Sequence, residues 1–212
     1  MENKIILPAE WYPQSAVQLT WPHDETDWAP ILDEVIPCFV SIAKEVIKHE
    51  KLLIVCPDEQ EVRRQLGDVD DSRIIFREMA TNDTWARDHG PITLVSKNSH
   101  NGLIVPIHLL DFRFNGWGEK FDWQLDNAIT RRLHQQGILN GQLESHDDFV
   151  LEGGSIHVDG EGTVITTDMC LLDPGRNASV TDYEPWSEEL RAYCDEQLKK
   201  YLGVEKVIWV KD

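Results

Sequence analysis

The sequence predicts an α/β fold, and two observations support this prediction. Apolar residues recur with the helical period in some segments and form short continuous or alternating runs in others, and the two kinds of segment follow one another along the chain. No long stretch rich in Pro, Ser or Gly interrupts the 212 residues, so we expect one domain over residues 1–212. A chain of this length can bury a sizeable core.

The amino-terminal third of the chain alternates strands with helical periodicity. Ala16–Trp21 is typical of a strand and is closed by Pro22. Apolar positions at helical spacing predict a helix over Ile31–Lys48, in which Pro37 either kinks the helix or marks its true start. The nearly continuous apolar run Lys51–Cys56 then predicts a buried strand.

A short helix follows, with Asp58 as its N-cap, Leu66 as its last residue and Gly67 as its stop. Further strands are predicted at Arg73–Arg77, Ile92–Ser96 and Leu103–Leu109.

The carboxyl-terminal half repeats the same alternation, which is typical of an α/β architecture. Helices are predicted over Trp123–Gln136, ending before Gly137, and over about Pro185–Tyr201, ending at Gly203. Strands are predicted at Phe149–Leu151, Ser155–Val158, Thr163–Thr167 and Lys206–Val210. The second and third of these strands are joined by the turn at 159–162 (DGEG).

Composition limits the partners and the compartment. A formal net charge of −18 argues against nucleic acid and anionic membranes, which bind basic patches, and is compatible with a small cationic partner. No run approaches the roughly 20 apolar residues of a membrane helix, and residues 1–8 lack the pattern of a signal peptide. The 4 cysteines form no CxxC pair and are expected to be reduced thiols. We therefore expect a soluble, cytoplasmic protein.

The segment 81–91 (TNDTWARDHGP) concentrates an indole, carboxylates, an Arg and a His. A carboxylate beside an indole suits a guanidinium or ammonium group, because the carboxylate accepts N–H bonds while the ring face attracts the cation. The alternative is a surface loop in which an Asp caps a turn and pairs with Arg87.

Two further segments carry candidate residues. In 111–118 (DFRFNGWG), glycines flank Trp117 and allow unusual ring positions, although a core or hinge aromatic is the alternative. In 151–155 (LEGGS), Glu152 could bind a cation or merely cap the glycine turn.

Other classes of site have little support. The histidines form no HxH or HxxxH spacing, so we expect no metal site; His89 has a carboxylate neighbour, and His157 lies in a predicted strand. The absence of GxSxG, P-loop and GxGxxG motifs argues against serine hydrolases, nucleotide kinases and Rossmann dehydrogenases.

Together, three segments resemble the agmatine deiminase family, also called the bacterial peptidylarginine-deiminase type, in their order and approximate spacing. They are 82–91 (NDTWARDHGP), 114–120 (FNGWGEK) and 152–157 (EGGSIH). Supporting matches are 8–11 (PAEW), 21–22 (WP), 166–172 (TTDMCLL) and 176–177 (RN). The resemblance covers essentially the whole chain, and its first segment is the most specific.

The resemblance implies a five-bladed α/β propeller of strand–strand–helix–strand modules, of which this chain would hold about three. It also implies a hydrolase that converts a guanidinium group to a ureido group with release of ammonia. The implied substrate is agmatine, giving N-carbamoylputrescine for polyamine synthesis; peptidylarginine and free arginine remain alternatives. In the family a cysteine thiolate attacks the guanidinium carbon and a histidine transfers protons, with no metal or other cofactor.

The resemblance also implies roles for individual residues. Asp88 matches the catalytic carboxylate that holds the guanidinium nitrogens, Trp85 the aromatic wall beside it, and Glu152 a further acidic contact. Trp117 and Asn115 match positions near the funnel, where a scaffold role is equally open. Arg87 is expected to orient a neighbouring carboxylate.

The chain departs from the family pattern in one respect. The family's catalytic histidine follows the strand matched by 207–210, and its nucleophilic cysteine lies further on, whereas this chain ends at Asp212. Neither Cys170 nor the other cysteines match the nucleophile, so we expect no nucleophile and no turnover in the isolated 212 residues. A non-catalytic remnant or guanidinium-binding protein is the alternative, and formation of a homo-oligomer is left open.

Overall fold

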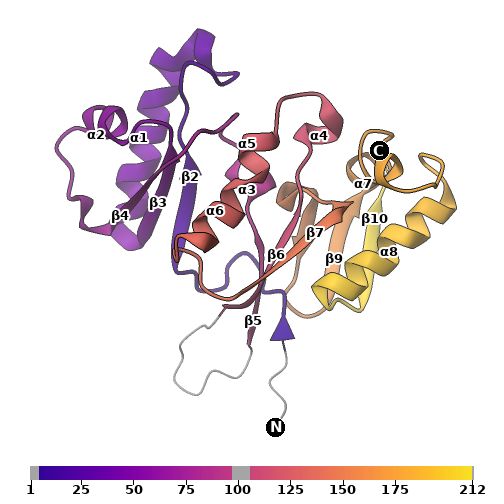
Figure 1. Cartoon of the computed structure of the whole chain (residues 1–212). Coiled ribbons are helices and arrows are strands. Elements are labelled where there is room, and N and C mark those ends of the chain that lie inside the picture. Colours follow the sequence, from indigo (N-terminus) through magenta and orange to yellow (C-terminus); the bar gives the residue numbers. More distant parts are fainter. Residues whose placement is uncertain (1–4, 97–105, 212) are drawn as a thin grey trace. The chain divides into compact units, whose positions relative to one another are not determined.

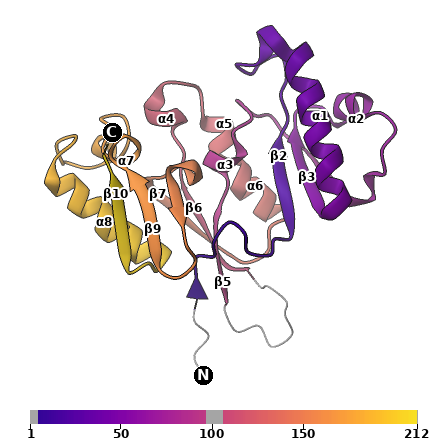
Figure 2. The ribbon, with the colours of Figure 1, turned by 180° about the vertical axis from the view of Figure 1, so that it is seen from behind.

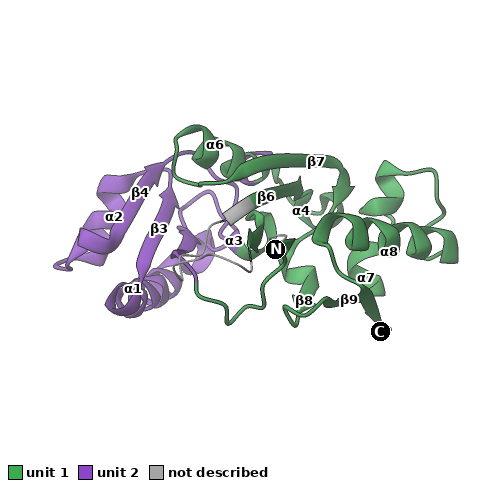
Figure 3. Ribbon diagram, turned by 90° about the horizontal axis from the view of Figure 1, so that it is seen from below, with its two compact units in different colours: residues 1–13, 87–123, 127–212 green, residues 14–86, 124–126 purple. Residues whose placement is uncertain are grey.

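The computed structural model describes residues 5–96 and 106–211, and the chain divides into two compact units (Figure 3). Unit 1 comprises residues 1–13, 87–123 and 127–212, and unit 2 comprises residues 14–86 and 124–126. The α/β class predicted from the sequence is confirmed in both units. The assignment of residues 1–212 to one domain stays a prediction.

Unit 2 is built on a parallel sheet of order β2-β3-β4, with helices in its two crossovers (Figure 1). The central strand β3 is buried over all but its first residue, as its apolar run predicts. The elements are β2 (Ala16–Thr20), α1 (Leu32–His49), β3 (Lys51–Cys56), α2 (Glu59–Leu66) and β4 (Ile74–Glu78). Short 3₁₀ turns lie at Ala29–Ile31 and Asp71–Arg73.

The helix ends of unit 2 follow the sequence signals. Helix α1 runs through Pro37 and neither begins nor ends there, so its true start is not at the proline. The Asp58 carboxylate accepts a hydrogen bond from the Glu61 backbone N–H at 3.0 Å, which makes Asp58 the predicted N-cap of α2. Gly67, with φ +68°, is its predicted stop.

Unit 1 contains two modules with the same order of strands, which we call modules A and B. Module A comprises β5 (Ile92–Ser96), β6 (Pro106–Arg113), α6 (Ile129–Gln135) and β7 (Gln142–Val150). Module B comprises β8 (Ile156–Val158), β9 (Thr163–Thr167), α8 (Glu188–Leu202) and β10 (Lys206–Val210). In each module the first two strands pair antiparallel and the last two pair parallel across the helix. Strand β1 (Ile5–Ile6) adds to the edge of module A.

Modules A and B share one apolar core, and α8 lies against the strands β9 and β10 of module B (Figure 2). Leu110, Phe112 and Phe149 come from the sheet of module A, whereas Leu190 and Leu198 come from α8 of module B. Because the two sheets bury the same helix, the strand ends of the two modules are held in a fixed relation within unit 1.

Three elements differ most from the sequence predictions. The helix predicted over Trp123–Gln136 is divided into α5 (Gln124–Asn127) and α6. At the division, the Asn127 side chain accepts a hydrogen bond from the Phe114 backbone N–H at 2.8 Å. Strand β7 begins at Gln142 rather than Phe149, because it pairs with β6 although its first residues are polar. Strand β6 continues to Arg113, and residues 103–105 of its predicted range lie outside the described residues.

Several short turns complete the chain. They are α3 (Ala86–His89), α4 (Gly116–Glu119), α7 (Asp168–Leu171) and the 3₁₀ turns at Gly153–Ser155 and Asn177–Val180. Among residues 5–96 and 106–211, no helix combines the length and the apolar character that crossing a membrane requires.

Candidate functional site

Asp88 lies in the single turn α3, directly before the first strand of module A. Its side chain is half-buried, and both of its oxygens accept hydrogen bonds. Oδ2 accepts from the indole Nε1–H of Trp117 at 3.1 Å, and Oδ1 accepts from the backbone N–H of Gly154 at 3.0 Å. Burial raises the pKa of Asp88, against the lowering effect of these two bonds. Neither of these two donors carries a formal charge.

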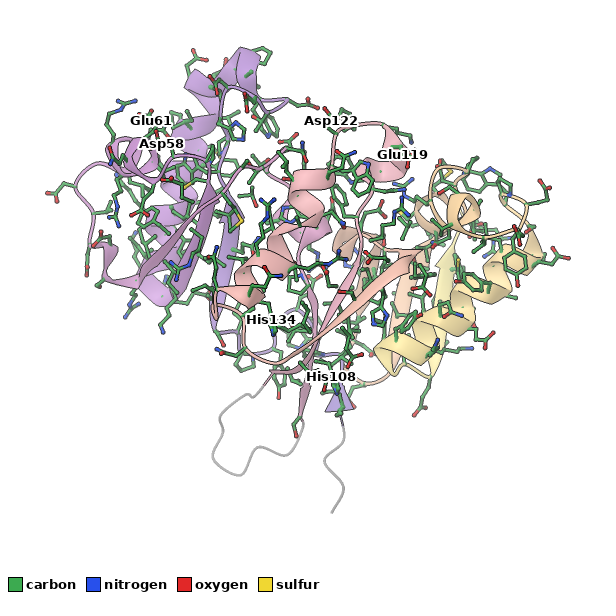
Figure 4. All side chains as sticks on the ribbon, viewed as in Figure 1. Asp58, Glu61, His108, Glu119, Asp122 and His134 are labelled. Carbon is green, nitrogen blue, oxygen red and sulfur yellow. The ribbon has the colours of Figure 1, made fainter. Side chains whose placement is uncertain are left out.

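Trp117 reaches Asp88 from a left-handed turn. Residues 116–119 all have positive φ, with values of +62°, +58°, +88° and +61°, and Trp117 itself has ψ +43°. Only glycine adopts this region without cost, and each non-glycine residue in it costs roughly 1–2 kcal/mol. The turn ends at Glu119, which is labelled in Figure 4. Such strain concentrates at functional sites because the surrounding structure must hold it in place.

The left-handed turn is held by the segment that precedes α8. The buried Asn115 donates from Nδ2 to the carbonyl of Gly175 at 2.8 Å and accepts at Oδ1 from the Gly118 N–H at 3.0 Å. The backbones of Gly118 and Gly175 approach so closely that a Cβ on Gly175 would lie 2.6 Å from the Gly118 carbonyl oxygen. Both positions therefore require glycine, and Asn115 has a scaffold role.

Glu152 follows the last strand of module A and is 2% exposed. Its Oε1 accepts from Nε–H of Arg176 at 2.8 Å, and Arg176 is itself 7% exposed. Its Oε2 is buried and has no hydrogen-bond partner among the described residues. Burial raises the pKa of Glu152; the Arg176 cation opposes this effect, and the Asp88 charge adds to it.

Three of the predicted site residues therefore come together in unit 1. Asp88 touches Trp117 directly, and Gly154, which also bonds Asp88, lies two residues beyond Glu152. The Asp88 charge disfavours ionisation of Glu152, so a cation between the two carboxylates is favoured. The unused Oε2 of Glu152 is an acceptor ready for an N–H donor, because a buried carboxylate oxygen without a partner is costly.

Trp85 and Arg87 have partners elsewhere. Trp85 belongs to unit 2, where it is 42% exposed and lies against Trp28 with ring centroids 6.0 Å apart. Its role as an aromatic wall stays a prediction. Arg87 forms an ion pair with Glu10 and donates to the Ile156 carbonyl at 3.4 Å.

The sequence reasoning missed two charged residues that hold the predicted ones. Arg176 belongs to the supporting match at 176–177 (RN), and its guanidinium is the partner of Glu152. In unit 2, the buried Asp126 accepts from the backbone N–H groups of Asn82 at 2.7 Å and Asp83 at 2.9 Å, and so holds the segment that leads to α3. Burial raises the pKa of Asp126 to about 6. No sequence signal marks Asp126, whereas the RN match could have directed attention to Arg176.

The described residues limit the chemistry of the site. Within 5–96 and 106–211, no group of three or more His, Cys, Asp or Glu side chains is arranged to hold a metal ion. Burial raises the pKa of Cys56 and of Cys194 to about 12, so neither is a thiolate at neutral pH. Burial lowers the pKa of His89 to about 4, so this imidazole is neutral at pH 7.

Comparison with known proteins decides the family. The model of the Porphyromonas-type peptidyl-arginine deiminase family matches residues 6–212. The chain belongs to this family. The resemblance stated from the sequence motifs is thereby confirmed.

Relatives of this peptidyl-arginine deiminase-type chain include agmatine deiminases. The agmatine deiminase of Stutzerimonas stutzeri (strain A1501) is 34% identical over 209 residues, which are 96% of this chain and 52% of that protein. A cysteine-to-serine variant of the C. jejuni agmatine deiminase with substrate bound superposes with a TM-score of 0.82 at 33% identity, over 99% of this chain and 57% of that one. A Porphyromonas gingivalis protein provisionally assigned as an arginine deiminase gives a TM-score of 0.80 at 46% identity, over 98% and 57%. The chain spans about half the length of the curated relatives it matches.

Proposed function

We propose that this chain supplies the guanidinium-holding part of an agmatine deiminase-type hydrolase. The observation that carries the proposal is the pair Asp88 and Glu152 in unit 1, with Oε2 of Glu152 buried and unused. The names of the relatives support agmatine as the substrate. The reaction adds water to the guanidinium carbon, gives the ureido product N-carbamoylputrescine and releases ammonia.

Each side chain of the site has a defined part in this proposal. The guanidinium N–H groups donate to Asp88 and to Oε2 of Glu152, which bind the cation through charge-assisted hydrogen bonds. Trp117 holds the Asp88 carboxylate through its indole N–H. Modules A and B are two repeating units of the five-bladed propeller in this proposal.

The nucleophilic step lies outside the part assigned to this chain. Attack on the guanidinium carbon needs a thiolate or an equivalent nucleophile. Cys56 and Cys194 are buried with pKa values of about 12, and Cys38 is on the outer helix α1 of unit 2. The fourth cysteine, Cys170 in α7, matches a family position other than that of the nucleophile. We therefore propose that the 212-residue chain binds agmatine and does not turn it over.

The test is calorimetric titration of the full chain with agmatine. Asp88→Asn removes one carboxylate charge, and a charge-assisted bond is worth about 1.5–3 kcal/mol, so we expect affinity to fall by roughly 10- to 100-fold. Asp195→Asn is the matched control, because Asp195 pairs with Lys199 on α8 outside the site. Unchanged affinity in Asp88→Asn would exclude the proposed binding mode.

Two further titrations decide the alternatives. Free arginine and a short arginine-containing peptide compete with agmatine on the same chain. We expect agmatine to bind most tightly because the described arginines near Asp88 and Glu152, Arg87 and Arg176, are already paired with carboxylates. An ammonia assay on the same samples is expected to give no signal. Ammonia release that disappears in Asp88→Asn would show that this chain contains its own nucleophile.

A further inference from the structure

Arg176 is almost completely buried, in the segment between β9 and α8 that also contacts the left-handed turn. Its backbone is fixed on both sides: its N–H donates to the Asp173 carbonyl at 3.0 Å, and its carbonyl accepts from the Ser179 N–H at 2.9 Å. The Asp173 carboxylate accepts from the Gly175 N–H at 2.9 Å and lies 3.7 Å from Nη1 of Arg176. The guanidinium thus extends from a rigid turn.

The bond from Arg176 to Glu152 uses one oxygen only. Nε–H of Arg176 meets Oε1 at 2.8 Å, with side-chain exposures of 9% for Arg176 and 3% for Glu152. A short bond between two buried groups fixes the plane of the carboxylate, and so fixes the direction of Oε2. Since Oε2 has no partner among the described residues, the contact orients an acceptor and leaves it unused.

We propose that Arg176 is the positioning residue of the site, which keeps Glu152 ionised and turns its Oε2 toward the guanidinium group of the ligand. This inference rests on the proposed function, and it assigns Arg176 no contact with the ligand. A buried carboxylate without a cation takes up a proton, and a protonated carboxyl attracts a guanidinium poorly.

The charged groups around Glu152 fix the sign of the expected pH effect. Arg176 favours the carboxylate, whereas burial and the Asp88 charge favour the protonated form. Arg176 also lowers the pKa of Asp88, as does Arg87 beside it, and Asp173 faces the Arg176 cation. Removing Arg176 therefore raises the pKa of Glu152 further, and the carboxylate returns only at higher pH.

The test compares Arg176→Gln and Arg176→Lys in the full chain by titration with agmatine from pH 6 to pH 9. In Arg176→Gln we expect the affinity for agmatine to fall by roughly 30-fold at pH 7 and to recover most of that loss by pH 9. The reason is that each unit by which the pKa of Glu152 rises lowers the ionised fraction of this carboxyl by up to tenfold. Arg176→Lys keeps the charge and loses the fixed Nε bond, so we expect affinity about tenfold lower at every pH and a pH profile like that of the wild type.

Arg131→Gln is the matched control. Arg131 donates from Nε to the buried Asp111 at 2.6 Å in module A, and so forms a comparable Arg–Asp pair that does not contact the site. We expect the affinity and pH profile of Arg131→Gln to equal those of the wild type. A loss in Arg176→Gln that is the same at all pH values would reduce Arg176 to a structural residue and overturn the proposal.

A second measurement needs no ligand. Titration of ¹³C-labelled glutamate side chains by NMR reads the pKa of Glu152, and we expect it to be at least one unit higher in Arg176→Gln than in the wild type. An unchanged pKa of Glu152 would overturn the proposal about Arg176. Failure of the wild type to bind agmatine would instead reject the proposed function, and the pKa measurement would still test the role of Arg176. If Arg176→Gln does not fold, Arg176→Lys decides: affinity equal to that of the wild type would exclude positioning through the Nε bond.

Discussion

Modules A and B share a strand order and also share the place of an acidic residue. Asp88 lies four residues before Ile92, the first residue of β5, and Glu152 lies four residues before Ile156, the first residue of β8. In each module, the connection from the second strand to the helix carries the side chain that bonds this acid. Trp117 bonds Asp88 in module A, and Arg176 bonds Glu152 in module B.

The two modules differ in the charge of that donor. The indole of Trp117 is neutral, so the half-buried Asp88 keeps its negative charge uncompensated by this contact. The guanidinium of Arg176 is positive and compensates the more deeply buried Glu152. Burial raises the pKa of both acids, and the module that buries its acid more deeply is the one that supplies a cation. The two carboxylates thus occupy equivalent positions in the two modules, but Asp88 is bonded by a neutral indole and Glu152 by a cation.

This difference predicts unequal losses of stability, which are the largest effects we expect. Glu152→Gln removes the carboxylate that bonds the buried Arg176 and leaves only Asp173 at 3.7 Å, so it should lower the free energy of unfolding by about 3–5 kcal/mol. Asp88→Asn leaves only neutral donors and should cost about 1–2 kcal/mol. Urea unfolding of the two variants measures both values.

The double variant Glu152→Gln/Arg176→Met sharpens this comparison. With both charges removed, the free energy of unfolding should recover most of the loss seen in Glu152→Gln, because no buried ion remains unpaired. Equal losses in the free energy of unfolding for Glu152→Gln and Asp88→Asn would show that the charge of the hydrogen-bond donor does not make the two modules differ in stability.

A second difference concerns the residue after each acid, which is His89 in module A and Gly153 in module B. His89 is 3% exposed, and burial lowers its pKa to about 4 from 6.5. A lowered histidine pKa stabilises the fold above pH 6.5, and this stability is lost as the pH falls from 6.5 to 4. The loss at pH 4 is about 3 kcal/mol, at 1.36 kcal/mol per pH unit.

Urea unfolding between pH 7 and pH 4 measures this loss as the difference between the wild type and His89→Gln. His157→Gln serves as the control, because the His157 side chain is 69% exposed. If His89→Gln loses as much stability on acidification as the wild type, the acid sensitivity of unit 1 lies elsewhere.

The contact between the two connections is the third point to test. A Cβ on Gly175 would lie 2.6 Å from the Gly118 carbonyl oxygen and 2.8 Å from its Cα, and backbone atoms cannot move aside cheaply. Gly175→Ala should therefore cost about 1–3 kcal/mol and should weaken agmatine binding as well, because it separates Trp117 from Arg176. Glu184→Ala, an exposed position in the same connection between β9 and α8, is the control in both the unfolding and binding measurements.

The sequence predicted those elements whose signals are local. The bounds of β3, β5 and β10 agree with the predicted ranges because each is a short apolar run, and Asp58 and Gly67 cap α2 through residue types that favour those backbone positions. Strand β7 was missed over residues 142–148, where charged residues form a strand because the neighbouring β6 pairs with them. A few consecutive residues of sequence do not reveal that pairing.

The same distinction separates the predicted site residues from the missed ones. Asp88, Trp117 and Glu152 stand out by residue type, since carboxylates and an indole beside glycines are suited to binding a cation. The Arg176–Glu152 pair joins positions 24 residues apart, and the positive φ of Trp117 depends on the packing of Gly118 against Gly175. Neither can be derived from composition or periodicity, because both depend on how modules A and B pack.

The smallest expected effect concerns the thiols, which also differ between the modules. Module A contains no cysteine, whereas Cys194 lies in α8 of module B, fully buried in the shared core and with a pKa raised to about 12. A thiol that is neither exposed nor ionised cannot attack a guanidinium carbon, so Cys194→Ala should leave agmatine binding unchanged. In the folded chain, a thiol reagent at pH 8 should label the exposed Cys38 rapidly and Cys194 only upon unfolding. Rapid labelling of Cys194, or weaker agmatine binding in Cys194→Ala, would mean that module B opens at α8 in solution, and the rigid support that we assign to Arg176 would then be lost.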